Sequence, residues 1–390
     1  MRYFIVLFLL FGSLMAFEQK SELGVEGKGY SQYVNEVVVE GKSELKFDNE
    51  YFTTKMALAF LYSNEYRERR YLLLNELYIT KEFKEYTLSI GKEIKYWGEL
   101  EGYNIADIYN QKNYLKDPFD KDAKLGTFGV NISRYFDENS LEFGVKFYEE
   151  DSKYPQNKTP FAPLPLEYDK NLQTSNERYS PTLYLKVNLV SDEILDSETS
   201  IILLRGYDTK RYFSATSATT LAQYAYRVNK AVFLSHIILD DTILKTEMAY
   251  TEVIEDKQVS DYTQLSFGIE HSLYDIFASD ITLYGEYYRY LYSDASKRKN
   301  VDISELYDND IFIAFRVNFN DVGSSDLKLG VLEDIFKDER VFKADFHSRF
   351  FKDFVVHGEF LQILSNAKYK TPISQFDNSS RFTLGLAYTF

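Results

Sequence analysis

Acidic side chains concentrate in residues 97–124, the first segment of this chain whose residue types and spacing could do chemistry. A ring of carboxylates facing a water-filled passage lowers the barrier for cations and raises it for anions. The alternative is an exposed acidic surface loop, and the sequence leaves both open. Three of these carboxylates could also offer oxygens to a calcium ion, but their spacing fits no EF-hand pattern, so we predict no metal site. The acidic candidates are Glu99, Glu101, Asp107, Asp117, Asp120 and Asp122.

Two of the four histidines flank a tight turn. If the two strands pair about residue 352, His347 lies opposite His357 and Asp345 lies opposite Glu359. Such a histidine pair could bind a transition metal, or could gate a passage when the imidazoles become charged near pH ~6. The simpler interpretation is a set of ordinary polar residues on the wall of a channel.

No motif of a known catalytic or cofactor site accompanies these residues. Zincin, P-loop, Rossmann and nucleophile-elbow patterns are absent from the sequence, and there is no cysteine for redox or metal chemistry. Lys and Arg total 45 against 60 Asp and Glu, a net charge of −15 without a basic tract, which argues against binding of nucleic acid. We therefore expect neither an enzyme, nor a cofactor, nor a nucleic-acid partner.

The elements that must position these side chains are β-strands. Apolar and polar residues alternate at period two along most of the chain, as in residues 141–148 and 381–390. This period is typical of strands with one apolar and one more polar face. The strands are about 10 to 13 residues long and carry aromatic residues near their ends, which favours a membrane-crossing barrel over a soluble sandwich.

Residues 1–16 have the form of a secretory signal peptide. Arg2 supplies the positive charge, residues 3–11 form the apolar region, and Ala16 precedes the expected cleavage point. We predict that residues 17–390 form a single domain, and they contain no apolar run long enough for a transmembrane helix.

The predicted fold class is all-β, a transmembrane antiparallel β-barrel of about 16 to 18 strands. Two places leave the count open. A hairpin at Asn229 would divide the long strand 219–239, and residues 21–35 could be a periplasmic stub. If both termini are periplasmic, the longest connections all fall on the outer side. These predicted extracellular loops are 97–124, 151–179, 209–218, 294–307 and 366–378.

The last strand carries a recognisable pattern of apolar residues at alternate positions, ending on Phe390. It resembles the C-terminal strand of Gram-negative outer-membrane barrels, which the barrel assembly machinery reads during biogenesis. The resemblance implies an outer-membrane destination, contact with outer-membrane lipid and that machinery as a partner. The matching residues are Phe382, Leu384, Leu386, Tyr388 and Phe390.

The long segment after the fifth predicted strand carries a second resemblance. In general porins, which this architecture resembles, the loop at that place folds inward and constricts the pore. Residues 91–120 are also similar in part to uncharacterised porin-like families, in which a Gly-Arg strand ends in Trp-Gly and leads to an Asn-Pro-x-Asp turn. Here Lys92 replaces the Arg, and Asp117 replaces the Asn.

These observations predict a porin-like channel for passive diffusion of small hydrophilic solutes, with a weak preference for cations. The alternatives are a barrel that acts through its surface loops, as an adhesin or structural protein, and a transporter for hydrophobic compounds. Monomer and trimer both remain open. The strand faces predict the side chains that point into the lumen, and these candidates are Glu93, Lys95, Trp97, Arg316, Lys343, Asp345, His347, Arg349, His357, Glu359 and Arg381.

Overall fold

The computed structural model describes residues 18–162, 166–169, 171–192, 195–297, 307–366, 368, 371 and 373–390. The predicted signal peptide lies outside these residues, and so do parts of the predicted loops 151–179, 294–307 and 366–378. No helix in the described part of the chain is long and apolar enough to cross a membrane.

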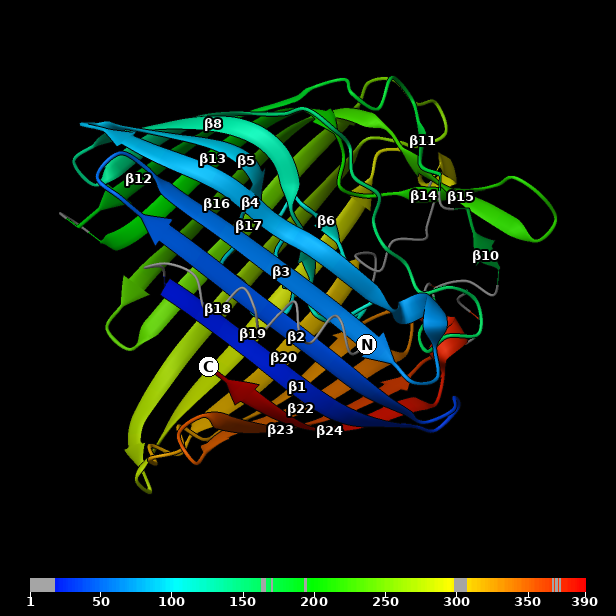
Figure 1. Cartoon of the computed structure of the whole chain (residues 1–390). Coiled ribbons are helices and arrows are strands. Elements are labelled where there is room, and N and C mark those ends of the chain that lie inside the picture. Colours follow the sequence, from blue (N-terminus) through cyan, green and yellow to red (C-terminus); the bar gives the residue numbers. More distant parts are fainter. Residues whose placement is uncertain are drawn as a thin grey trace.

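Eighteen antiparallel strands form one sheet that closes on itself, because β1 pairs with β24 (Figure 1). Each strand pairs with the next barrel strand along the chain. The first nine barrel strands are β1 (Glu18–Tyr30), β2 (Glu36–Asp48), β3 (Thr53–Ser63), β4 (Tyr71–Phe83), β5 (Tyr86–Glu93), β8 (Thr127–Phe136), β9 (Asn139–Lys146), β12 (Thr182–Ser191) and β13 (Asp196–Tyr207).

The second nine strands complete the barrel, and the closed all-β fold confirms the predicted fold class. Since β1 is a full barrel strand, the periplasmic-stub alternative for residues 21–35 is wrong. The remaining barrel strands are β16 (Arg227–Leu239), β17 (Thr242–Val253), β18 (Tyr262–Ile276), β19 (Ser279–Tyr292), β20 (Asn309–Asn318), β21 (Asp326–Asp334), β22 (Glu339–Phe350), β23 (Phe354–Leu364) and β24 (Ser379–Thr389).

The predicted long strand 219–239 is two strands. Its second part is the barrel strand β16, while its first part, β15 (Thr220–Ala225), leaves the barrel and pairs with three short strands. Residues 229 and 230 lie inside β16, so no hairpin divides it. The small sheet projects from one end of the barrel (Figure 1), and its other strands are β10 (Glu167–Tyr168), β11 (Gln173–Thr174) and β14 (Tyr212–Ala215).

The long connections lie at one end of the barrel, as the up-and-down order of the strands requires. The segments 97–124, 151–179 and 209–218 each follow an odd-numbered barrel strand in spatial order, as do the connections before β20 and β24. Two short strands, β6 (Gln111–Lys112) and β7 (Lys124–Leu125), form a hairpin within the first of these segments. The short 3-10 helices are η2 (Arg67–Arg69), η3 (Ala295–Lys297) and η6 (Ser374–Phe376).

Alternation along each strand separates an outer apolar face from an inner face. In β24, Phe382 and Leu384 are 55% and 56% exposed, whereas the intervening Arg381 and Thr383 are 2% and 3% exposed. The large apolar side chains of β24 therefore face outward, while its inner face lines the lumen.

Candidate functional site

Loop 97–124 turns from the end of β5 into the interior of the barrel. The turn is made at Gly98, whose φ is +137° and where a Cβ atom would lie 2.4 Å from the Cβ of Asn104. Only glycine adopts this conformation without strain or overlap. The Trp97-Gly98 pair therefore sets the direction in which the chain leaves the wall.

Two carboxylates on the far wall hold the tip of this loop. Glu247 on β17 accepts the backbone N–H groups of Glu99 at 2.7 Å and Ala106 at 2.8 Å. Glu286 on β19 accepts those of Glu101 at 2.6 Å and Gly102 at 2.9 Å. Hydrogen bonds to charged groups contribute about 1.5 to 3 kcal/mol each. The loop thus spans the lumen and is fixed on the side away from its own strand.

A second part of the loop is held by two arginines. Arg69 in η2 donates to the carbonyl oxygens of Leu115 at 3.2 Å and Lys116 at 3.0 Å. Arg381 on β24 donates to Asp117 at 2.6 Å and to Glu359 on β23. Burial raises the pKa of Asp117, but the Arg381 guanidinium outweighs burial and holds that pKa well below its usual range. Asp117 therefore stays ionised and tied to the wall at neutral pH.

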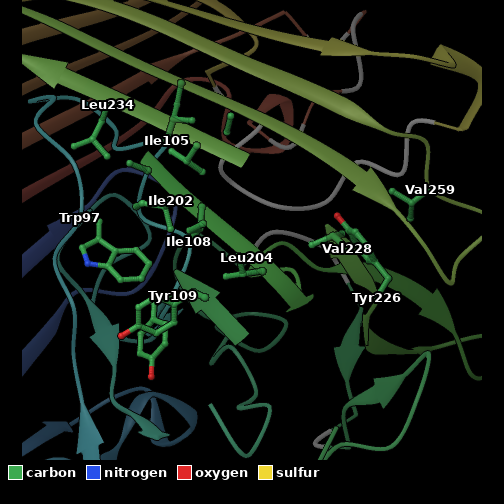
Figure 2. Packing of buried hydrophobic residues seen from close by; sticks show 14 of the residues in the cluster. Trp97, Ile105, Ile108, Tyr109, Ile202, Leu204, Tyr226, Val228, Leu234 and Val259 are labelled. Atoms are coloured by element: carbon green, nitrogen blue, oxygen red, sulfur yellow. The ribbon is translucent and has the colours of Figure 1, made fainter. Parts of the chain in front are cut away.

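One side of the loop is an apolar and aromatic core. Trp97 is 6% exposed and packs against Tyr109 of the loop, with ring centroids 5.5 Å apart (Figure 2). Tyr184 of β12 completes a triangle of rings, at 5.1 Å from Trp97 and 5.3 Å from Tyr109. The inner faces of β13 and β16 complete this cluster with buried aliphatic residues, including Ile202 and Val232. We call this side of the lumen, bounded by β12, β13, β16 and β17, the aromatic half.

The opposite side of the loop faces charged side chains of β20 to β24 and β1 to β3, and we call it the charged half. A cavity of about 240 Å³ lies there between the loop and the wall. Phe119 and Phe312 form part of its apolar lining. Lys343 on β22 also lines it and forms ion pairs with Asp345 at 3.1 Å and Glu359 at 3.2 Å. The wall can therefore offer both signs of charge to a solute.

The structure pairs four of the six predicted loop acids with basic residues. Glu101 contacts Lys328 on β21, Asp117 contacts Arg381, and Asp120 lies 3.0 Å from Lys116. Burial raises the pKa of Glu101, and nearby Lys121 and Lys328 lower it below its usual value. These charges are compensated within the protein.

The prediction that the loop acids face a passage is least accurate for Asp107. Its carboxylate lies 3.0 Å from Lys112 and 2.8 Å from Lys124, both in the hairpin of the same loop, and its side chain is buried. Asp107 is therefore a structural ion partner that does not face the passage. Among the described residues, only Glu99 and Asp122 of the set have no lysine or arginine partner; Glu99 lies 3.7 Å from His236.

The other predicted lumen residues lie on the inner face. Lys95 contacts Glu142 at 2.7 Å and Glu93 at 3.3 Å, which ties β5 to β9. Arg316 lies 3.3 Å from Asp326. Arg349, next to the turn after β22, donates to the carbonyl oxygen of Lys352 at 3.4 Å.

The register of β22 and β23 places His347 opposite His357 and Asp345 opposite Glu359, as predicted. The two rings turn to different neighbours, however. His357 contacts Glu26 on β1 at 2.8 Å, and His347 lies 3.7 Å from Asp326 on β21. In the described part of the chain, the histidine pair belongs to no group of three converging metal-ligand side chains.

A glycine makes room for the contact between His357 and Glu26. His357 reaches over β24 to β1, and a Cβ on the intervening Gly385 would lie 2.0 Å from its ring. The five residues of the predicted assembly signal, in contrast, are all exposed on the outer face: Phe382, Leu384, Leu386, Tyr388 and Phe390.

Sequence reasoning placed Arg381 on the lumen face but missed Glu247 and Tyr288, two of the residues that hold the loop. Glu247 is fully buried, and Tyr288 on β19 accepts the N–H of Tyr103 at 2.9 Å. A signal was present, because residues 201–204 and 231–234 are apolar on both strand faces. A lumen wall that is apolar on its inner face requires another segment to cover it.

Comparisons with known proteins define the class of the fold. No protein-family model matches the chain, and no curated protein matches it at a significant level. Three crystal structures of Pseudomonas aeruginosa proteins are similar to it in fold. OpdQ has a TM-score of 0.58 at 11% identity, covering 97% of this chain and 99% of that chain. OccK5 (OpdH) has a TM-score of 0.56 at 9% identity, covering 96% and 97%.

OccK3 (OpdO) has a TM-score of 0.55 at 12% identity, covering 96% of this chain and 95% of that chain. The predicted resemblance to porin-like outer-membrane barrels is confirmed at the level of the fold. The chain is thus a closed 18-stranded antiparallel β-barrel with the same fold as these structures.

Proposed function

We propose that this protein is an outer-membrane channel for passive diffusion of small hydrophilic solutes, with loop 97–124 as its constriction. One observation carries the proposal. The loop divides the interior of an 18-stranded barrel, closing one side with an apolar core and leaving the other side lined by ionisable groups. Barrels of this strand number are wide enough to enclose an aqueous channel.

The proposed path runs through the charged half, between the loop and the wall of β20 to β24. A polar solute exchanges water for hydrogen bonds to paired charges, such as Lys328 with Glu101 and Lys343 with Asp345. These pairs bind both donors and acceptors weakly, so a solute can enter and leave. The cavity width beside the loop sets the size limit.

The proposed cation preference is weak and comes from few groups. Because Asp107, Asp117 and Asp120 are compensated by basic partners, their charges contribute little to the field along the path. Glu99 and Asp122 are the loop acids that leave a net negative charge near the constriction.

The proposed location is the outer membrane, with the apolar outer face in contact with lipid and the barrel assembly machinery as the partner in biogenesis. The outward apolar residues of β24, among them Leu384 and Tyr388, support this location. The five apolar positions of that strand would be read during insertion.

The test is single-channel conductance of the refolded mature protein in a planar bilayer, with a salt gradient for the reversal potential. Discrete open steps and a small cation-directed reversal potential are expected. Steps with anion preference would support the channel but contradict the proposed effect of Glu99 and Asp122 on selectivity. A protein that migrates as a folded barrel on gels but gives no steps would contradict the channel and favour a role for the surface loops.

A further inference from the structure

A groove of about 380 Å³ lies on the outer wall, across β12, β13, β16 and β17. Strand pairing aligns its outward-facing residues in two rows. The row nearer the long loops places Arg205 beside Asn229, and Asn229 beside Glu252. The next row places Leu203 beside Ala231, and Ala231 beside Tyr250. The groove therefore has a polar rim and an apolar floor.

The floor is shaped by one small residue. Ala231 stands between Leu203 and Tyr250, two larger outward side chains that are 50% and 51% exposed. A methyl group among longer side chains leaves a depression in an otherwise continuous apolar surface. A flexible hydrocarbon chain fills such a depression better than the rigid surface of another barrel does.

The rim carries an arginine without an ion partner. Arg205 is exposed, and no described residue forms an ion pair with it, whereas Glu252 accepts a hydrogen bond from the Asn229 side chain at 2.8 Å. Arg340 on β22 offers a direct contrast, because it also faces outward near the same end of the barrel but is bonded to Glu333 at 2.7 Å. The charge of Arg205 is available to an external anion.

We propose that this groove binds a phosphorylated lipid of the outer leaflet, lipid A, with an acyl chain over Ala231 and a phosphate on Arg205. The inference rests on the proposed outer-membrane location. Arginine binds phosphate through two parallel N–H donors, which suits a phosphate at the head-group level. An acyl chain below it continues the apolar floor toward the membrane interior.

Glu252 does not prevent this contact. It lies two strands from Arg205, and at a strand spacing of about 4.8 Å the backbones of the two residues are roughly 10 Å apart. This exceeds the Debye length of about 8 Å at physiological ionic strength. The carboxylate is also occupied by Asn229, so the phosphate meets the arginine first.

The experiment is native mass spectrometry of the full mature protein in detergent, titrated with bis-phosphorylated, hexa-acylated lipid A. The test variants are Arg205→Gln and Ala231→Leu. The matched controls are Arg340→Gln, which removes a paired outward arginine, and Ala344→Leu, which enlarges an outward alanine between Leu329 and Phe360. Both test variants are expected to bind about tenfold more weakly, and both controls as wild type.

Dephosphorylated lipid A separates the two halves of the proposal. It is expected to bind wild type about tenfold more weakly than the phosphorylated form, and to bind Arg205→Gln no more weakly than it binds wild type. Equal binding by test and control variants would overturn the site. A dimer or trimer that Ala231→Leu dissociates would show that a second copy occupies the groove, and would also overturn it.

Single-channel conductance of the same variants tests the lipid site separately from the proposed channel function. The groove faces away from the lumen, so Arg205→Gln and Ala231→Leu should give wild-type steps. Lost lipid binding with normal steps supports the lipid site alone, and normal lipid binding without steps contradicts the channel alone.

Discussion

The aromatic half and the charged half of the lumen are built from the same kind of strand but differ in how their inner side chains are packed. In the aromatic half, Trp97, Tyr109 and Tyr184 pack with the aliphatic inner faces of β13 and β16, as in the core of a soluble protein. In the charged half, Lys343, Asp345 and Glu359 form ion pairs around a cavity. One loop separates the two environments.

The difference shows how a barrel can set its own pore width. An apolar inner wall exposed to water is costly, and burying each large aliphatic side chain gains about 1.5 to 3 kcal/mol. This gain draws the loop to β12, β13, β16 and β17. Glu247 and Glu286 then fix the position of the loop. Their side chains accept hydrogen bonds from loop N–H groups that have no partner strand. The wall across from it keeps its charged side chains around the cavity.

The largest effect is expected when both tethers are removed together. The double variant Glu247→Ala with Glu286→Ala deletes the four hydrogen bonds that the loop backbone donates to these side chains, each worth about 0.5 to 3 kcal/mol. The loop tip should leave its site, so single-channel conductance should rise several-fold. Trp97, which is the single tryptophan of the chain, should shift its emission to longer wavelength.

The matched control for the tethers is Glu270→Ala on β18. Its carboxylate is paired with Lys245 at 2.6 Å and makes no described hydrogen bond to the loop. Unchanged conductance and emission in the double variant would show that the loop is held by its apolar contacts alone.

The next effect compares one residue from each half. Trp97→Ala should lower the free energy of unfolding by about 3 to 5 kcal/mol, because it leaves a cavity in a dry core. Lys343→Ala should cost no more than about 1 kcal/mol, since its ion pairs are partly exposed. The temperature at which the folded barrel is lost on gels would rank the two, with Trp97→Phe as the conservative control. Equal losses of stability in Trp97→Ala and Lys343→Ala would contradict the division of the lumen into a packed apolar half and a charged half.

A smaller effect is expected from pH at the edge of the charged half. Asp117 has an ordinary pKa of 3.8 that is lowered in the folded protein, so its bond to Arg381 stabilises the loop fully above about pH 4. That contribution is lost as the pH falls from 3.8 through the lowered value. Asp117→Asn should cost about 1.5 to 3 kcal/mol at pH 7.

Thermal unfolding between pH 7 and pH 3 checks the Asp117 contact. The variant should lose less stability on acidification than wild type does, because the titrating group is gone. Parallel curves for the two proteins would place the acid sensitivity elsewhere.

The smallest effect concerns selectivity. The double variant Glu99→Gln with Asp122→Asn should reduce the cation-directed reversal potential. Each removed charge should change the difference between the cation and anion barriers by less than about 1 kcal/mol in an aqueous lumen. Asp107→Asn should leave selectivity unchanged, since that carboxylate is buried between Lys112 and Lys124. A larger shift from Asp107→Asn than from the double variant would reverse this assignment.

Much of the wall could be predicted from the sequence because strand periodicity is a local property. The alternation in residues 381–390 placed Arg381 inside and Phe382 outside, and the hairpin about residue 352 fixed which histidines face each other. The boundary near residue 226 was missed because β15 and β16 follow each other with continuous strand character and no turn residues.

The partners of the loop acids could not be predicted in the same way. Asp117 meets Arg381, 264 positions away, and Glu101 meets Lys328, 227 positions away. Asp107 meets Lys112 and Lys124 only because β6 and β7 form a hairpin inside the loop. No spacing in the sequence encodes these encounters.

The sequence by itself thus determined most of the strands, their inner and outer faces and the register of the hairpin about residue 352, since each depends on residues close together in the chain. Only the tertiary structure decided which acids are neutralised, which half of the lumen is dry and which arginine on the outer wall is left unpaired. Closing the barrel brings distant strands to the same loop, and the electrostatic environment of a side chain is set by those distant neighbours.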